Sequence, residues 1–186
     1  MSDYKIQLDQ IHAAASAIKQ GEIIAYPTEA VYGLGVDPTQ EAAVEKLYEL
    51  KKRDPNKGCI IVAASWDMVK HFTRTIPNYD KVFASWPGHV TWVFPASSIV
   101  PRIVQNPDNT VAIRVSNHPI IQSLCQELDS PIVSTSANMH NGEPAKTAAE
   151  VAKIFGNNIT TIIDAKIGSN HSVSTIKNAI NGEILR

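Results

Sequence analysis

Residues 23–36 read IIAYPTEAVYGLGV, an apolar run followed by a segment rich in turn-forming residues. The run at 23–26 has the composition of a buried strand, and Pro27 predicts its end, so we expect a loop from Pro27 to Val36. Upstream, apolar residues recur at helical spacing and a glycine follows as a stop signal: Leu8, Ile11, Ala15, Ile18 and Gly21. A helix that leads into a buried strand and then a loop is typical of an α/β fold.

The same alternation continues to the end of the chain. Further strands are predicted at 59–63, 90–94, 110–115, 131–134, 160–164 and 174–176. Helices are predicted after Asp37 (N-cap, with Pro38 and Gln40), from Ser65, at 79–85, at 119–128, and after Thr147 with Glu150 in capping-box position; 96–109 is predicted as an exposed loop. We expect one α/β domain over residues 1–186, with helices packed on a twisted mixed sheet.

Composition and charge indicate which kinds of partner and site this protein can have. Of the 186 residues, 44% are hydrophobic, and 17 Lys and Arg nearly balance 18 Asp and Glu, so any anion site must be local. No signal peptide or membrane-spanning run is visible, and we expect a cytoplasmic protein without a membrane partner. Cys59 and Cys125 lie among apolar residues and fit reduced core thiols. The six histidines lack paired helical spacing, which predicts no structural metal site.

Three loops beside predicted strands carry residues that could do chemistry, as expected for an α/β protein. In the first, 26–35, Gly33 and Gly35 could let the backbone approach a ligand. The third glycine of the dinucleotide fingerprint is missing, and no Gly-Lys-Ser/Thr phosphate loop occurs in the sequence. Taken alone, this loop favours a tight strand-to-helix turn.

The second loop carries Lys51, Arg53 and Lys57, where a helix ends and a Pro-Asn turn follows. If the three cations converge, a shared polyphosphate would relieve their repulsion. A helix C-terminus whose lysines complement the helix dipole is an equally good interpretation of this loop alone.

The third loop carries Ser134, Thr135, Ser136 and Asn138 at the end of an apolar strand. No Gly-x-Ser-x-Gly motif surrounds Ser136, which argues against a serine nucleophile. These groups fit either hydrogen-bond partners of a polar ligand or helix-cap and turn hydroxyls. Separately, Arg114 lies within an apolar strand and needs either a ligand carboxylate or a structural carboxylate as its partner.

Considered in order, these motifs resemble those of the YrdC/TsaC family, the threonylcarbamoyl-AMP synthases. The matching residues are Tyr26-Pro-Thr-Glu-x-Val-Tyr-Gly-Leu-Gly35, Lys51-x-Arg53 with Lys57, Trp86-Pro-Gly88 with Thr91, Ala112-x-Arg114, Ser134-Thr-Ser-Ala-Asn138 with Gly142, and Ser174-Thr-Ile176. Each motif is modest alone, but their joint order over nearly the whole chain is specific.

The resemblance implies a YrdC-like fold and a nucleotidyl transfer. L-threonine, bicarbonate and ATP would give threonylcarbamoyl-AMP and pyrophosphate for threonylcarbamoyladenosine in tRNA. By the same resemblance, Lys51 and Arg53 would be catalytic, and the remaining assignments fall into two groups. ATP would contact Arg53, Lys57, Thr110, Asn138, Lys146 and Arg186, and threonine would contact Thr28, Arg114, Ser136 and Ser174. Mg²⁺ would be held mainly by the ATP phosphates, without a protein metal site.

Two residues depart from the family pattern. Ala30 stands where many members have threonine, which removes a hydroxyl, and Arg186 is the last residue, so its own α-carboxylate would offset its charge. The chain resembles the short bacterial form, which is expected to rely on separate tRNA threonylcarbamoyl transferase proteins.

Two rival functions follow from the same family. The first is an RNA-binding module, and weak tRNA binding is a further expectation, although the near-neutral net charge argues against RNA binding as the main function. The second is a carbamoyl-adenylate former like the related domain of hydrogenase maturation factors. Those proteins carry cysteine-paired zinc modules, which this sequence lacks.

Overall fold

The computed structural model describes residues 2–54, 57–139, 142–159, 161–170 and 172–186. Its helices are α1 (Ser2–Lys19), α2 (Glu41–Lys51), α3 (Asp80–Phe83), α4 (Pro119–Leu128) and α5 (Ala148–Phe155). Its strands are β1 (Ile24–Pro27), β2 (Tyr32–Val36), β3 (Ile60–Ala63), β4 (Val90–Pro95), β5 (Thr110–Val115), β6 (Ile132–Ser136), β7 (Thr161–Ile162) and β8 (Thr175–Asn178). Short 3₁₀ turns occupy Lys70–Phe72, Arg102–Val104 and Gly156–Asn158.

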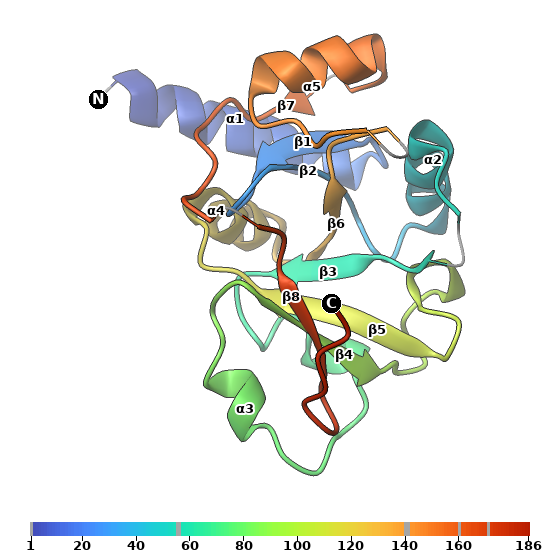
Figure 1. The fold of residues 1–186 in the computed structure, drawn as a ribbon. Coiled ribbons are helices and arrows are strands. Elements are labelled where there is room, and N and C mark those ends of the chain that lie inside the picture. The colour runs from blue at the N-terminus through green and yellow to red at the C-terminus, as the bar shows by residue number, and fades with distance from the viewer. Residues whose placement is uncertain (1, 55–56, 140–141, 160, 171) are drawn as a thin grey trace.

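The strands form a single mixed sheet in the order β7-β1-β2-β6-β3-β5-β4-β8 (Figure 1). The pairs β1/β7, β3/β5 and β4/β8 are parallel, and the other neighbours are antiparallel. Helix α4 returns the chain from β5 to β6, near the centre of the sheet. The predicted α/β fold with a mixed sheet is confirmed.

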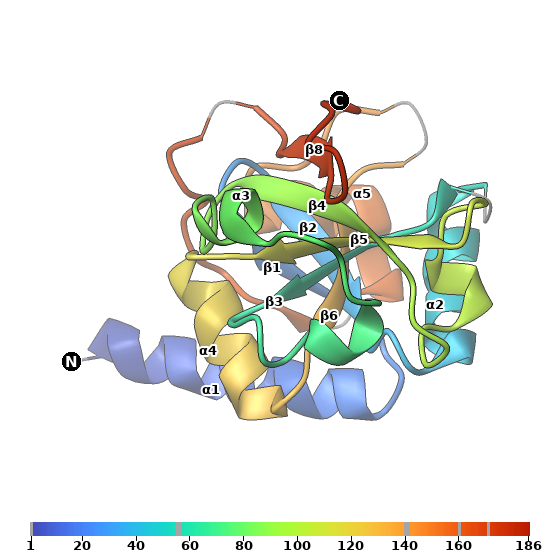
Figure 2. The same ribbon diagram turned by 90° about the horizontal axis from the view of Figure 1, so that it is seen from below.

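Two apolar clusters cover the sheet. In one, Ile11 and Ile18 of α1 pack with Ile121 and Leu124 of α4 against sheet residues that include Ile24. In the other, α2 and α5 pack against alternate residues of the same strands. Figure 2 shows α1 and α4 on one side of the molecule, and β8 with the C-terminus on the other. Both cysteines are buried free thiols, as predicted.

The prediction of a loop from Pro27 to Val36 is wrong, because this segment folds back as a β-hairpin. The Thr28 backbone N–H and the Thr28 hydroxyl both donate to the Val31 carbonyl, at 2.9 and 2.8 Å, and close the turn. Beyond the turn, β2 pairs with β1 along its length. Gly33 and Gly35 suggested a turn from sequence, but they lie in the strand beneath the ring of Tyr26.

Two predicted helix starts are also wrong. The Asp37 carboxylate accepts from the Thr39 backbone and hydroxyl and forms a turn, so α2 begins only at Glu41. After Ser65 the chain forms only the 3₁₀ turn at Lys70–Phe72.

Several other elements are confirmed. Helix α4 has the predicted bounds, and the Thr147 side chain caps α5 by accepting from the Glu150 N–H. The Glu150 carboxylate returns to the Lys146 N–H at 2.6 Å, one residue before the position expected for a capping box. Strands are present at the predicted positions in β3, β4, β5, β6 and β8, whereas β7 is shorter than the predicted 160–164, and Thr160 lies outside the described residues.

The packing of Tyr26 over Gly35 gives a test of the hairpin. A β-carbon at Gly35 would lie 2.8 Å from Cε1 of the fully buried Tyr26 ring, so Gly35→Ala must displace that ring. We expect the free energy of unfolding in urea to fall by about 1–3 kcal/mol. In a Tyr26→Leu background, the same substitution should have a smaller effect. An equal effect in both backgrounds would contradict this packing.

Candidate active site

A cleft of about 530 Å³ opens where β2, β3, β5 and β6 meet the C-terminal segment. Strand register explains which residues face it. Ile60 pairs with Ala112 on one side and Ser134 on the other, and Gly33 pairs with Ser136, so these residues share one face of the sheet. All of them line the cleft.

Four cationic side chains line this cleft although the chain is almost neutral overall: Arg53, Lys57, Arg114 and Arg186. The Arg53 guanidinium donates to the Gly58 carbonyl at 2.8 Å and lies 3.3 Å from the Thr135 hydroxyl. Burial lowers the pKa of Arg186, and the positive charges of Arg53 and Arg114 lower it further. Positive side chains are therefore concentrated at this cleft, where an anion site remains a prediction.

The expectation that Lys51, Arg53 and Lys57 converge is wrong for Lys51. Its side chain is buried, it is not among the residues that line the cleft, and its ammonium group donates to the carbonyls of Ser136 (2.5 Å) and Asn138 (2.6 Å). Burial lowers the pKa of Lys51 to about 8, and repulsion from Arg53 acts in the same direction. Lys51 thus holds the 134–138 loop in place. The predicted Pro-Asn turn at 55–56 lies outside the described residues.

Ser136 and Asn138 are tied to each other within this loop. The Ser136 hydroxyl donates to the Asn138 side-chain oxygen at 2.6 Å, and the Asn138 amide donates to the Gly142 carbonyl at 2.8 Å. Ser136 lines the cleft, but Asn138 and Lys146 are not among its lining residues. Lys146 is exposed, and its described contact is the backbone bond to Glu150.

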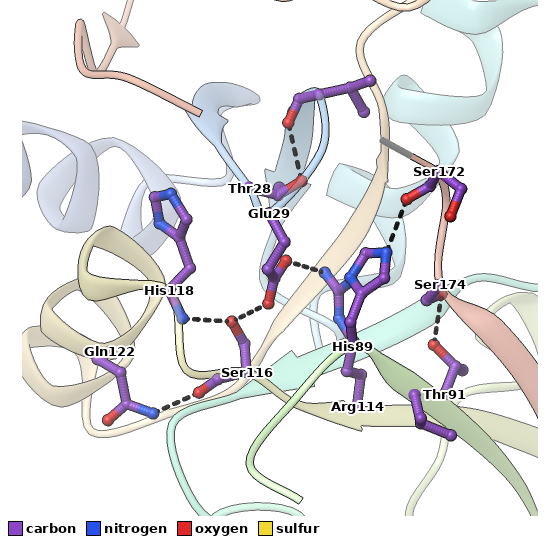
Figure 3. A network of polar contacts seen from close by, with 12 residues as sticks. Thr28, Glu29, His89, Thr91, Arg114, Ser116, His118, Gln122, Ser172 and Ser174 are labelled. Carbon is purple, nitrogen blue, oxygen red and sulfur yellow. Dashed lines mark hydrogen bonds and ion pairs between the residues drawn. The ribbon is translucent and has the colours of Figure 1, made fainter. Parts of the chain in front are cut away.

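Arg114 has a structural carboxylate as its partner, a choice that the sequence left open. Its guanidinium lies 3.2 Å from Glu29, and both side chains are less than a tenth exposed. Figure 3 shows Glu29 between Arg114 and Ser116, whose hydroxyl donates to the other carboxylate oxygen at 2.6 Å. Glu29 and Ser116 were not singled out from the sequence. The need of Arg114 for a partner was the signal that could have led to Glu29, within the conspicuous 26–35 loop.

The other predicted residues also reach the cleft, each held by neighbours. Thr28 is fixed by its bond to Val31, Ser174 lies 2.8 Å from the Thr91 hydroxyl, and the Thr110 hydroxyl donates to Asp108 at 2.6 Å. His89, not predicted from sequence, lies 3.4 Å from Arg114 and 2.7 Å from the Ser172 carbonyl. Ala30 also lines the cleft and offers it a methyl group rather than a hydroxyl.

The described part of the chain offers neither a cluster of metal-ligating side chains nor a membrane-spanning helix. There, His, Cys, Asp and Glu side chains form no group of three that could hold a metal ion. Over the same residues, none of the helices combines the length and apolar character needed to cross a membrane.

The sequence of this chain is similar to those of proteins in one known family. The model of the Sua5/YciO/YrdC family, described as "Telomere recombination", matches residues 16–186. The threonylcarbamoyl-AMP synthase of Coxiella burnetii is 42% identical over 188 residues, which cover 100% of both chains. The enzyme of the same name from Pseudoalteromonas translucida is 42% identical over 95% of this chain and 96% of its own.

A solved structure agrees with these sequence relatives. The crystal structure of P. abyssi Sua5 complexed with L-threonine superposes with a TM-score of 0.85 at 35% identity. The match covers 90% of this chain and 50% of that one, so the chain spans about half the length of P. abyssi Sua5.

The buried ammonium of Lys51 predicts a pH-dependent stability. Because the pKa is about 8 in the folded protein and ordinarily 10.5, the unfolded chain binds more protons between these values. The free energy of unfolding of the wild type, minus that of Lys51→Met, should therefore rise as pH increases from 8 to 10.5, by at most about 1.4 kcal/mol per pH unit. Denaturant titrations of both proteins across this range measure the difference, and a flat or falling difference would contradict the assigned burial.

Proposed function

Since the chain belongs to the Sua5/YciO/YrdC family, we propose that it makes threonylcarbamoyl-AMP from L-threonine, bicarbonate and ATP, with release of pyrophosphate. The product would serve threonylcarbamoyladenosine formation in tRNA. One observation carries the proposal. A single cleft is lined both by the cations Arg53, Lys57 and Arg186 and by Arg114, a buried arginine that is ion-paired with Glu29. Such a cleft suits one polyphosphate and one amino acid side by side.

The ATP half of the cleft would be formed by Arg53, Lys57 and Arg186, with Thr110 beside them. Arginine forks and a lysine point charge suit the many acceptor oxygens of a triphosphate. The Arg53 Nε–H is buried without a hydrogen-bond partner among the described residues, and a phosphate oxygen could satisfy it. Asn138 and Lys146, outside the lining of the cleft, would contact ATP only if it extends to the 138–146 segment.

The threonine half would be formed by Arg114, Thr28, Ser136 and Ser174. A structure of P. abyssi Sua5 with L-threonine supports an amino-acid site in this fold. Arg114 can donate to the substrate carboxylate because its Nε–H, like that of Arg53, has no partner among the described residues. The hydroxyl oxygens of Thr28 and Ser136, whose protons go to Val31 and Asn138, can accept from the threonine amine, and the Ser174 hydroxyl, paired with Thr91, lies beside them.

The chemistry needs no protein nucleophile. The threonine amine attacks the carbon of bicarbonate, a C–N bond forms, and water leaves to give a carbamate. A carbamate oxygen then attacks the α-phosphorus of ATP, and the bond to the β-phosphate oxygen breaks to release pyrophosphate. The protein would contribute alignment of the two substrates and neutralisation of the charge that builds on the phosphates.

We assign Lys51 as a positioning residue in this scheme rather than a substrate contact. Its ammonium group fixes the carbonyls of Ser136 and Asn138, and so the place of the Ser136 hydroxyl at the cleft. Mg²⁺ would be held mainly by the ATP phosphates and would neutralise their charge. Asp108 is an acidic side chain that lines the cleft, and it could contact the hydrated ion. The product would pass to separate tRNA threonylcarbamoyl transferase proteins in the cytoplasm.

The first test of this function is substrate dependence. Purified protein should release pyrophosphate from ATP only when L-threonine and bicarbonate are both present, because the attacking oxygen belongs to their carbamate. A coupled pyrophosphate assay with each substrate omitted in turn measures this. Release without threonine would contradict the amino-acid assignment.

A second test concerns the cation group. Arg53→Ala should lower the rate of pyrophosphate release by at least about 100-fold, because one charge-assisted donor to the phosphates is lost. The matched control is Arg74→Ala, an exposed arginine outside the lining of the cleft, which should keep the wild-type rate. Circular dichroism establishes that both variants fold. A folded Arg53→Ala variant with wild-type turnover would remove Arg53 from the mechanism.

A further inference from the structure

The cations that line the cleft are not equivalent, because Arg114 has a buried carboxylate beside it. The Glu29 side chain is 5% exposed and lies 3.2 Å from the Arg114 guanidinium. Glu29 is not among the residues that line the cleft, whereas Arg114 is. The carboxylate therefore lies behind the arginine, where it balances the charge of Arg114 without facing a ligand.

Glu29 is also held firmly in place. The Ser116 hydroxyl donates to one carboxylate oxygen, and the His118 backbone N–H donates to the Ser116 oxygen at 3.0 Å. The Glu29 carbonyl accepts from the Asn170 backbone N–H at 3.0 Å. Figure 3 shows this chain of contacts running from the start of α4 to Arg114. Such a network fixes the position of the carboxylate beside Arg114.

The remaining arginines of the cleft contact neutral oxygens. Arg53 donates to the Gly58 carbonyl and contacts the Thr135 hydroxyl, and Arg186 donates to the Ser174 carbonyl at 3.4 Å. The pKa of Arg186 is lowered first by burial and then by the positive charges of Arg53 and Arg114, so the three arginines of the cleft lie within reach of one another. Within the described residues, the cleft thus has one part around Arg114, whose charge is paired with Glu29, and a second, cationic part around Arg53, Lys57 and Arg186, which Asp108 also lines.

We propose that Glu29 is a specificity-determining residue that keeps phosphate groups out of the amino-acid half of the cleft. This inference rests on the proposed function, since it assigns threonine to Arg114. With Glu29 behind it, Arg114 forms a neutral pair that suits the carboxylate of a zwitterionic amino acid. A polyphosphate is attracted more strongly to Arg53, Lys57 and Arg186 than to the neutral pair at Arg114. Each substrate is therefore directed to its own half of the cleft.

Removing only the charge of Glu29 should allow phosphate groups to bind in the amino-acid half of the cleft. In Glu29→Gln, Arg114 becomes an uncompensated cation beside three others, and the cleft gains one positive charge. A polyanion would then be attracted to Arg114 as well, and it would compete with threonine there. A residue that merely supports the fold would weaken threonine binding without creating this competition.

The test is equilibrium dialysis of labelled L-threonine against the full chain, with inorganic pyrophosphate as the competing polyanion. In the wild type, pyrophosphate should change threonine affinity by less than about threefold. In Glu29→Gln, it should weaken threonine binding by about tenfold or more. Glu29→Asp, which keeps the charge, should behave like the wild type. Glu127→Gln, an exposed carboxylate paired with His12, is the matched control and should show no new competition.

A second measurement needs only the wild type and remains decisive if Glu29→Gln does not fold. Between about 50 and 300 mM NaCl, threonine affinity should change less than about twofold, because its site is charge-balanced. Pyrophosphate affinity should fall by about tenfold over the same range.

The outcomes separate this inference from the proposed function. A wild-type protein that binds no threonine would overturn the proposed function and this inference with it. Threonine binding that is displaced by pyrophosphate equally in the wild type and in Glu29→Gln would overturn the role of Glu29 alone. So would a folded Glu29→Gln variant without competition, or threonine affinity in the wild type that falls as steeply with salt as pyrophosphate affinity.

Discussion

The repulsion among cations gathered in one cleft is the constraint on which the rest of the site depends. Four basic side chains line the cleft, and a fifth, Lys51, is buried close to it. The fold reduces this repulsion differently for each side chain. Glu29 balances Arg114, backbone carbonyls accept from Lys51, and Arg53 donates to the neutral Gly58 carbonyl, which leaves its charge for a ligand to neutralise. A protein with a net charge of −1 can thereby present a strongly positive site.

The sheet explains why these groups meet although they are far apart in sequence. Antiparallel pairing of β2 with β6 brings the hairpin of residues 24–36 against the 134–138 loop, and β3 lies between β6 and β5, which carries Arg114. The turn at Thr28–Val31 then directs Glu29 towards Arg114, behind the residues that line the cleft. Within the proposed function, this geometry sets the two substrates side by side without a protein nucleophile.

Much of the fold could be predicted from local pattern, and the errors have physical causes. Apolar runs and caps identified β3 to β6, α4 and the Thr147 cap of α5, because these depend on neighbours in sequence. The hairpin strand β2 was missed because Gly33 and Gly35 resemble turn residues, and only the Tyr26 ring packed over them explains their presence in a strand. For the site, burial of Arg114 was predicted, but its pairing with Glu29 spans 85 residues and depends on the tertiary fold. The turning of Lys51 away from the cleft depends likewise on where the 134–138 loop lies.

The central claim is that one cleft holds two substrates in halves of different charge. A crystal structure of the protein with a non-hydrolysable ATP analogue and L-threonine tests it most directly. We predict phosphate oxygens on Arg53, Lys57 and Arg186, and the threonine carboxylate on Arg114 while Glu29 remains paired behind it. Phosphate on Arg114, or threonine bound away from it, would contradict this account.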